Sequence, residues 1–239
     1  TMPPKAFMFG LPYDDYQNLH VRKYGFHGTS HRFVSAALAE AMGRDIKDLK
    51  IVSCHLGNGS SITAVDGGKS IDTSMGFTPL DGVVMGTRTG AVDPSAVTFV
   101  ADKHHFTPSE MSEYMNKKSG FLGVSGIGSH NRDGQAPSLE GNKRAKLVSD
   151  MLVYEIKKYI GSYAAAMNGL DAVLFTGGIG ENSYEVREGV CEDMDYFGIK
   201  IDKELNRRER GKLVKISTPD SKVEVWIVPT NEELLNARD

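Results

Sequence analysis

The chain has 239 residues, a formal net charge of −3 at pH 7 and 40% hydrophobic residues, which suits one large α/β domain or two small ones. Acidic and basic residues are interspersed and no apolar run reaches the roughly 20 residues needed to cross a bilayer, so we expect neither nucleic acid nor a membrane as a partner. Cys54 and Cys191 are too few for a disulfide framework, which favours a cytoplasmic location.

The first half of the chain predicts a helix, a strand and a hairpin in succession. The expected elements are an irregular segment over 1–24, a helix over about 30–42, a strand over 49–56, and hairpin strands over 62–65 and 70–73. Gly43 is expected to end the helix. The turn Asp66-Gly67-Gly68 is the strongest local signal, because two adjacent glycines favour a tight hairpin.

The second half is dominated by helices with clear start signals. Asp93-Pro94 and Thr107-Pro108 each place a capping residue before a proline at the first helical position. The expected elements are helices over 94–104, from 108 and over 142–168, strands over 172–176, near 199–201 and over 223–228, a charged helix between the last two strands, and a helix from about Asn231. This alternation predicts an α/β fold with a mixed central sheet flanked by helices.

Two glycine-rich turns follow predicted strands, at Gly57–Ser61 and at Gly177–Asn182. Neither is a dinucleotide fingerprint, because the third glycine is missing, and Gly68-Lys69-Ser70 lacks the first glycine of a P-loop. Their backbone N–H groups nevertheless suit phosphate, and we expect the hydroxyls of Ser60 and Ser61 to face the ligand. After the second turn, a helix N-terminus is expected to face phosphate. An ordinary connecting turn remains the alternative for each.

His27 and His31 lie four residues apart, the first just ahead of a predicted helix. The spacing matches two zinc ligands on one helix face, but the glutamate of the H-E-x-x-H motif is absent and Gly28 lies between them, so metal binding is the less favoured interpretation. We predict that His27 donates a hydrogen bond to a phosphoryl oxygen, with a capping or core role as the alternative. His31 is predicted to be structural.

Arg88 lies between Gly86 and Gly90, which let the backbone turn and expose the side chain. Its planar, permanently charged guanidinium suits a phosphoryl group, although a surface ion pair is the alternative. Cys54 and His55 are neighbours on a predicted strand and should point to opposite faces, which argues against a Cys–His catalytic pair.

The segments GFHGTSH, HLGNGSS, SIDTSMGFTPLDGVVMGTRTGAVDPS, FTGGIGENS and PTNEEL, in this order, resemble the acetate kinase family over nearly the whole chain. The resemblance implies a ribonuclease H-like/actin-like ATPase lobe, with residues 1–24 leading into it, 25–230 forming the nucleotide-binding second lobe and 231–239 starting a truncated C-terminal helix. It also implies reversible in-line phosphoryl transfer from ATP to acetate, giving acetyl phosphate and ADP. Mg²⁺ or Mn²⁺ would accompany the nucleotide, and the protein would be a homodimer.

The resemblance assigns roles position by position. The transition-state groups fall on His27 and Arg88, and the acid that helps to hold magnesium falls on Glu232. The remaining positions are phosphate contacts at His55, Asn58 and Gly59, adenosine contacts at Gly178, Ile179, Gly180 and Asn182, an adenine-side contact at Arg132, walls of a methyl pocket at Phe26 and Pro79, and a substrate-site arginine at Arg187. The run His130-Asn131-Arg132 departs from the family pattern, since relatives commonly carry an acid where His130 stands.

No counterpart of the family's first lobe is found in these residues, so its phosphate loop, acetate-binding arginine and catalytic aspartate are missing. We therefore expect the chain alone to lack turnover, because positioning supplies most of the catalysis in this chemistry. A propionate or butyrate kinase is an alternative, since one or two methylenes change binding by only about 1 to 3 kcal/mol. A non-catalytic nucleotide-binding module is a further alternative.

Overall fold

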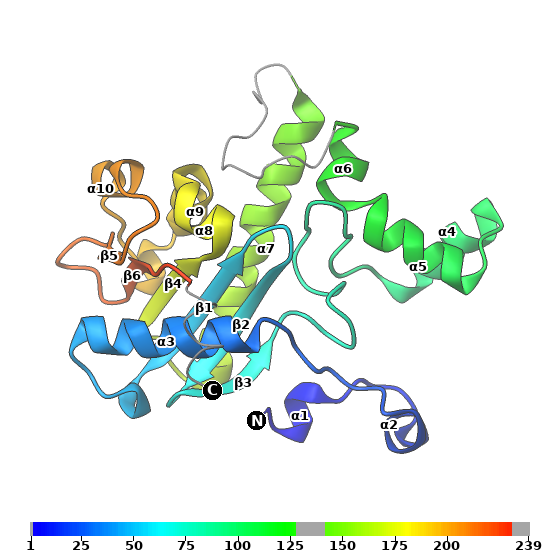
Figure 1. The fold of residues 1–239 in the computed structure, drawn as a ribbon, viewed down its shortest axis with the longest axis horizontal. Helices are drawn as coiled ribbons and strands as arrows, with labels where there is room; N and C mark the ends of the chain where they lie inside the picture. Colours follow the sequence, from blue (N-terminus) through cyan, green and yellow to red (C-terminus); the bar gives the residue numbers. More distant parts are fainter. Residues whose placement is uncertain (1, 128–141, 231–239) are drawn as a thin grey trace.

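The computed structural model describes residues 2–127 and 142–230, which form a six-stranded mixed sheet flanked by helices (Figure 1). The strands are β1 (Lys50–Leu56), β2 (Ser60–Asp66), β3 (Lys69–Thr73), β4 (Ala172–Thr176), β5 (Val214–Lys215) and β6 (Glu224–Ile227). Their order is β3-β2-β1-β4-β6-β5, with β1, β4 and β6 parallel and the others antiparallel to their neighbours. The predicted fold class is confirmed.

Two long helices cover the sheet, α3 on one face and α7 on the other (Figure 1). The helices are α1 (Pro4–Phe7), α2 (Tyr13–Leu19), α3 (Gly28–Met42), α4 (Pro94–His104), α5 (Pro108–Lys117), α6 (Gly120–Ser125), α7 (Lys143–Met167), α8 (Gly177–Asn182), α9 (Tyr184–Cys191) and α10 (Lys203–Arg208), with short 3₁₀ turns at Ile46–Asp48 and Asp195–Phe197. None of the helices in the described residues has the length and hydropathy of a membrane-spanning segment.

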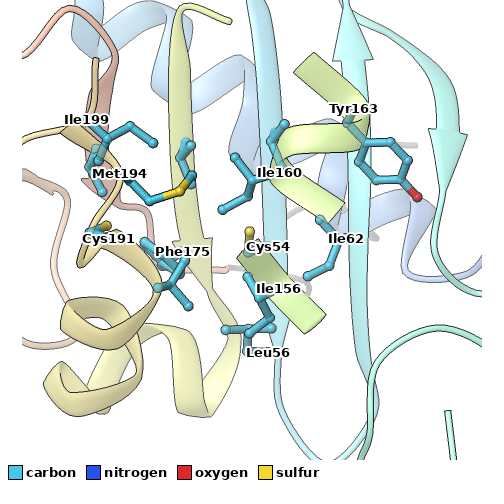
Figure 2. Packing of buried hydrophobic residues seen from close by; sticks show 14 of the residues in the cluster. Cys54, Leu56, Ile62, Ile156, Ile160, Tyr163, Phe175, Cys191, Met194 and Ile199 are labelled. Carbon is cyan, nitrogen blue, oxygen red and sulfur yellow. The ribbon is translucent and has the colours of Figure 1, made fainter. Parts of the chain in front are cut away.

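The larger core lies between the sheet and α7. Cys54 and Leu56 of β1 pack there with Ile156 and Ile160 of α7 and with Phe175 of β4 (Figure 2). All five side chains are fully buried. At roughly 25 cal/mol for each Å² of buried apolar surface, this layer is the main source of stability for the strands that carry the site.

The α3 side of the sheet is partly polar. Because side chains alternate along a strand, Ile51 joins the apolar cluster under α3, while Ser53 and His55 reach the histidine and serine side chains of that helix. Cys54 and His55 therefore lie on opposite faces, as predicted. A polar layer on this face leads directly to the candidate site.

The predicted start signals are confirmed. Asp93 caps α4 by accepting from Ser95 N, and the capping box of Thr107 is complete. Asn142, which was expected to be the first residue of the helix, is instead the N-cap of α7. Gly67 and Gly68 both have positive φ, at 58° and 80°, as a two-glycine hairpin turn requires. Caps and turns of this kind are decided by local backbone hydrogen bonds, so the sequence specifies them well.

Several short elements differ from expectation. Residues 1–24 are not wholly irregular, since they contain α1 and α2, and both α6 and β5 were not predicted. The expected strand near 199–201 is wrong: Ile199 and Ile201 form only isolated bridges, to Val223 and Ser217. These pieces are too short to carry a period and depend on partners elsewhere in the chain. The predicted helix from Asn231 lies outside the described residues.

Candidate functional site

The candidate site lies where the three parallel strands end. The glycine turn at 57–59 follows β1, α8 follows β4, and residues 228–230 follow β6. Parallel pairing of His55 with Thr176 and of Phe175 with Ile227 brings these three segments to one edge of the sheet. In open α/β sheets, the carboxyl edge of the strands is where ligands bind.

The glycines after β4 pack tightly on β1. A Cβ on Gly177, which has a φ of 77°, would lie 2.6 Å from the carbonyl oxygen of Leu56, so only glycine fits. The carboxylate of Glu181 accepts hydrogen bonds from Gly177 N and from Thr230 N, each at 3.1 Å. Glu181 thus joins the segments that follow β4 and β6.

The four positions expected to contact adenosine all lie on α8. Gly178 is exposed, Ile179 is half-buried and Gly180 is buried against β4. Asn182 Nδ2 donates to Gly178 O at 2.9 Å. A helix does follow this glycine run, as predicted, because α9 begins at Tyr184. The run itself is also helical, since α8 begins at Gly177 and the glycines form its first turn. Close packing on β1 holds the chain here, in place of a separate loop.

His27 is the N-cap of α3 and has a left-handed backbone, with a φ of 58°. For a residue with a Cβ this conformation costs roughly 1 to 2 kcal/mol, and such strain often accompanies functional sites. A hydrogen bond of 2.9 Å joins its Nδ1 to Ser61 Oγ. The ring also stacks on that of His55, with centroids 4.1 Å apart and an interplanar angle of 19°.

His27 and Arg88 converge on the turn after β1. A Cβ on Gly59 would lie 3.3 Å from Arg88 Nη1 and 3.5 Å from His27 Nε2. The imidazole and the guanidinium therefore approach one point above the glycine, although the two residues are 61 positions apart in the sequence. Asn58, which is exposed, lies in the same turn. The structure thus brings the two charge-handling groups and the proposed phosphate contacts together.

Arg88 is held at its side chain by a hydrogen bond and at its backbone by close packing. Its Nη1 donates to the carbonyl oxygen of Pro79 at 3.0 Å, so the expected pocket residue Pro79 lies beside the guanidinium. Behind the loop, Gly120 packs so closely that a Cβ there would lie 2.0 Å from Met85 O. Phe26, the other expected pocket residue, is half-buried and directly precedes His27.

The serine hydroxyls of the first turn do not face outward as expected. Ser60 and Ser61 are both buried. Ser60 Oγ is hydrogen-bonded to backbone atoms of Gly57, and Ser61 Oγ lies between His27 Nδ1 and His31 Nε2. That prediction is wrong because these hydroxyls complete hydrogen bonds within the protein, as buried polar groups usually do.

Arg187 is fully buried, and its guanidinium donates only to protein oxygens among the described residues. Nε and Nη2 donate to the side-chain and main-chain oxygens of Asn206, Nη1 donates to Gly180 O, and Nη2 also donates to Glu209 O. In this structure the guanidinium supports α8 from within the lobe and does not line an open pocket. Arg132, His130, Asn131 and Glu232 lie outside the described residues.

Two site-supporting groups were not found from the sequence. Ser30 Oγ is hydrogen-bonded to His55 Nδ1 at 2.8 Å, and Glu181 bridges two backbone N–H groups as described. Ser30 lies in the first turn of α3, where serine has no distinctive signal. Glu181 lies inside the FTGGIGENS segment, and the sequence does not indicate that its carboxylate accepts from the distant Thr230 N.

The buried histidines are electrically neutral near pH 7. Burial, and then repulsion by His27, lowers the pKa of His55 to about 4. Burial lowers the pKa of His31 well below its usual value, with smaller contributions from His55 and His27. Desolvation penalises the charged form of each ring. His31 is held by Ser53 and Ser61, which confirms its predicted structural role.

These pKa shifts predict that acidification destabilises the fold. Between pH 6.5 and 4 the unfolded state binds a proton at position 55 that the folded state does not, so the unfolding free energy falls as the pH falls. We expect the pKa shift of His55 alone to lower the unfolding free energy by about 2 kcal/mol on going from pH 7 to pH 5. Urea unfolding at both pH values would measure the total loss, to which His31 also contributes, and His55→Gln should reduce that loss by about the amount due to His55. Equal pH slopes for the two proteins would contradict the prediction.

The fold and the site together define a class: an α/β lobe with a mixed central sheet between helices, and glycine segments at the carboxyl ends of its parallel strands. The profile of the Acetokinase family matches residues 1–238. The chain belongs to this family.

Similar proteins support the assignment. The chain is 52% identical over 239 residues to "Acetate kinase 2" of Clostridium perfringens and 54% identical to "Acetate kinase" of Methanosarcina thermophila, all of it being matched in both cases. Crystal structures of Porphyromonas gingivalis acetate kinase and of a propionate kinase from Francisella tularensis superpose on the whole chain with TM-scores of 0.97 and 0.91 and identities of 49% and 39%. The chain spans 58% to 60% of the length of these relatives.

Proposed function

We propose that these residues form the nucleotide-binding lobe of an acetate kinase, which transfers the terminal phosphoryl group of ATP to acetate and gives acetyl phosphate and ADP. The observation that carries the proposal is the convergence of His27 and Arg88 on Gly59 at the carboxyl end of β1. Segment 25–230 would be this lobe, residues 1–24 would lead into it, and 231–239 would begin the C-terminal helix.

In the proposed reaction, a carboxylate oxygen of acetate attacks the γ-phosphorus as the bond to the β–γ bridging oxygen breaks, and its electron pair leaves with ADP. Arg88 would bind equatorial oxygens of the transferred group through its planar N–H donors, and His27 would donate to the same group. His55, Asn58 and Gly59 would contact phosphate. Neutral His55 suits this position as a donor, because it accepts no proton until about pH 4.

The adenosine would lie over Gly178, Ile179, Gly180 and Asn182, with Arg132 on the adenine side. Exposed Gly178 supports this, because no Cβ covers its backbone. Phe26 and Pro79 would enclose the acetate methyl group, and Pro79 is held beside Arg88 by its carbonyl oxygen. We propose Arg187 as an indirect contributor to the acetate site, acting through α8.

Magnesium, or manganese, would neutralise charge on the nucleotide phosphates when it is bound. Glu232, its proposed protein partner, lies outside the described residues, and the described residues contain no group of three or more candidate ligands. Mg²⁺ usually takes one or two carboxylates together with phosphates and water, so the fold need not supply a dedicated cage. A homodimer and a cytoplasmic location remain predictions from the family resemblance and the composition.

A chimaera tests the proposal. Residues 1–239 would replace the matching 60% of Porphyromonas gingivalis acetate kinase, whose structure superposes with a TM-score of 0.97. We expect this chimaera to form acyl hydroxamate from ATP and acetate, and the 239 residues alone to bind ATP without acid-dependent turnover. Binding of ATP by a folded chimaera with no phosphorylation of any acid would instead favour a nucleotide-binding module.

The substrate is decided by the same assay with acetate, propionate and butyrate. Propionate and butyrate remain candidate substrates because the structure of the Francisella tularensis propionate kinase superposes on the chain with a TM-score of 0.91. One extra methylene changes kcat/KM by only about 10- to 200-fold in an apolar pocket, so all three acids must be compared. A higher kcat/KM for propionate or butyrate would replace acetate as the proposed substrate.

A further inference from the structure

Three hydrogen bonds in series, two of them buried and the last one partly buried, connect the core to His27. Ser53 Oγ and His31 Nδ1 are 2.7 Å apart, His31 Nε2 and Ser61 Oγ are 2.7 Å apart, and Ser61 Oγ and His27 Nδ1 are 2.9 Å apart. The first three members are 4% exposed or less. The first two bonds therefore lie out of water, and the series crosses from β1 through α3 to β2 before it reaches the partly buried N-cap residue His27.

The direction of these hydrogen bonds is set at Ser53. Within the described part of the chain, Ser53 Oγ is hydrogen-bonded only to His31 Nδ1. Its hydroxyl proton is satisfied only if Ser53 donates and His31 Nδ1 accepts. The reverse direction would leave a buried hydroxyl proton without an acceptor, which costs the desolvation of that group.

The remaining bonds follow from this one. His31 is neutral, so it carries one proton and one lone pair. With Nδ1 accepting, its proton is on Nε2 and is donated to Ser61 Oγ. The hydroxyl of Ser61 then donates to His27 Nδ1, which leaves Nε2 as the protonated nitrogen of a neutral His27.

We propose that Ser53, His31 and Ser61 form a relay that fixes His27 in the tautomer with its proton on Nε2. This edge of the ring faces Gly59, 3.5 Å from the position of a Cβ there. His27 can then donate toward a phosphoryl oxygen without acquiring a second proton. The three relay members are positioning residues, and the catalytic meaning of the relay rests on the proposed function.

Long-range proton–nitrogen correlation spectra of the labelled 239-residue chain test the tautomers directly. We expect protonated Nε2 and unprotonated Nδ1 at both His27 and His31 above pH 7. Protonated Nδ1 at either residue would overturn the relay. This measurement needs no substitution and no turnover, so it stands apart from the proposed function.

Ser61→Ala tests whether the relay acts on His27. We expect the His27 signals to show a mixture of tautomers in this variant. Ser35→Ala is the matched control, because Ser35 lies on α3 and its buried hydroxyl has no hydrogen-bond partner among residues 2–127 and 142–230. The control should leave the His27 signals unchanged, and unchanged His27 signals in Ser61→Ala would contradict the proposal.

The kinetic consequence is measured in the chimaera. We expect Ser61→Ala to lower kcat by about 10- to 100-fold, as for loss of an outer partner that orients a ligating histidine, while the KM for ATP changes little. Ser35→Ala should keep both values. Normal kcat in a Ser61→Ala chimaera would show that the relay does not contribute to catalysis. An active parent chimaera with Nδ1-protonated His27 would contradict the relay alone, whereas an inactive parent with the expected tautomers would contradict the proposed function alone.

Discussion

Replacing Arg88 by alanine in the chimaera is expected to lower kcat by about 10²- to 10³-fold, the usual loss when one fixed donor to a developing negative charge is removed. Arg88→Lys should recover little of it, because an ammonium cannot reproduce the planar donors of a guanidinium that is already fixed by Pro79 O. The measurement is steady-state acyl hydroxamate formation at saturating ATP and acetate.

His27→Ala should lower kcat by a similar factor. The fold-loss in kcat of the double variant should be smaller than the product of the two single fold-losses. Non-additivity is expected because both groups approach the same point above Gly59 and would act on one phosphoryl group. Arg44→Ala is the matched control, since Arg44 is an exposed arginine that pairs with Asp171 away from the site. Fully multiplicative losses would show that the two residues act at separate places.

Local hydrogen bonding explains which parts of the fold were predictable from the sequence. The caps at Asp93 and Thr107 and the glycine pair of the hairpin form within a few residues, so their sequence signals are complete. The long periodic pattern of α7 was equally informative, because its buried residues repeat at helical spacing.

Tertiary contacts explain what the sequence did not specify. Helix α6 begins where the backbone N–H groups of Phe121 and Leu122 donate to Met85 O and Gly86 O, far away in the chain. Likewise, Ile199 and Ile201 are apolar enough for a strand but meet only isolated partners. Neither outcome depends on the residues of the segment alone.

The candidate site divides in the same way. His27, Arg88 and Gly59 were singled out by residue type, since glycine, imidazole and guanidinium suit phosphate wherever they occur together. Their convergence depends on the sheet order, which places β1 beside β4, and on the packing of Gly120 behind the arginine loop. The outward role expected for Ser61 failed because the sequence could not reveal His31 as its buried partner.

Arg187 offers a second large effect, on stability. Its guanidinium is fully buried, and burial lowers its pKa to about 10, which still leaves it charged at pH 7. Its hydrogen-bond partners are neutral oxygens of Asn206, Gly180 and Glu209. Arg187→Met keeps the apolar volume of the side chain but leaves these acceptor oxygens without a donor. Each buried and unpaired acceptor costs about 1 to 3 kcal/mol.

We therefore expect Arg187→Met to lower the unfolding free energy by about 3 to 5 kcal/mol, measured by urea denaturation of the 239-residue chain. Arg208→Met, at an exposed position on the neighbouring α10, is the matched control and should change stability little. A direct role in binding the acid predicts the opposite pattern, with normal stability and a raised KM for acetate in the chimaera. Because the two outcomes differ in kind, one pair of measurements decides whether this arginine supports the glycine segment of α8 or contacts the substrate.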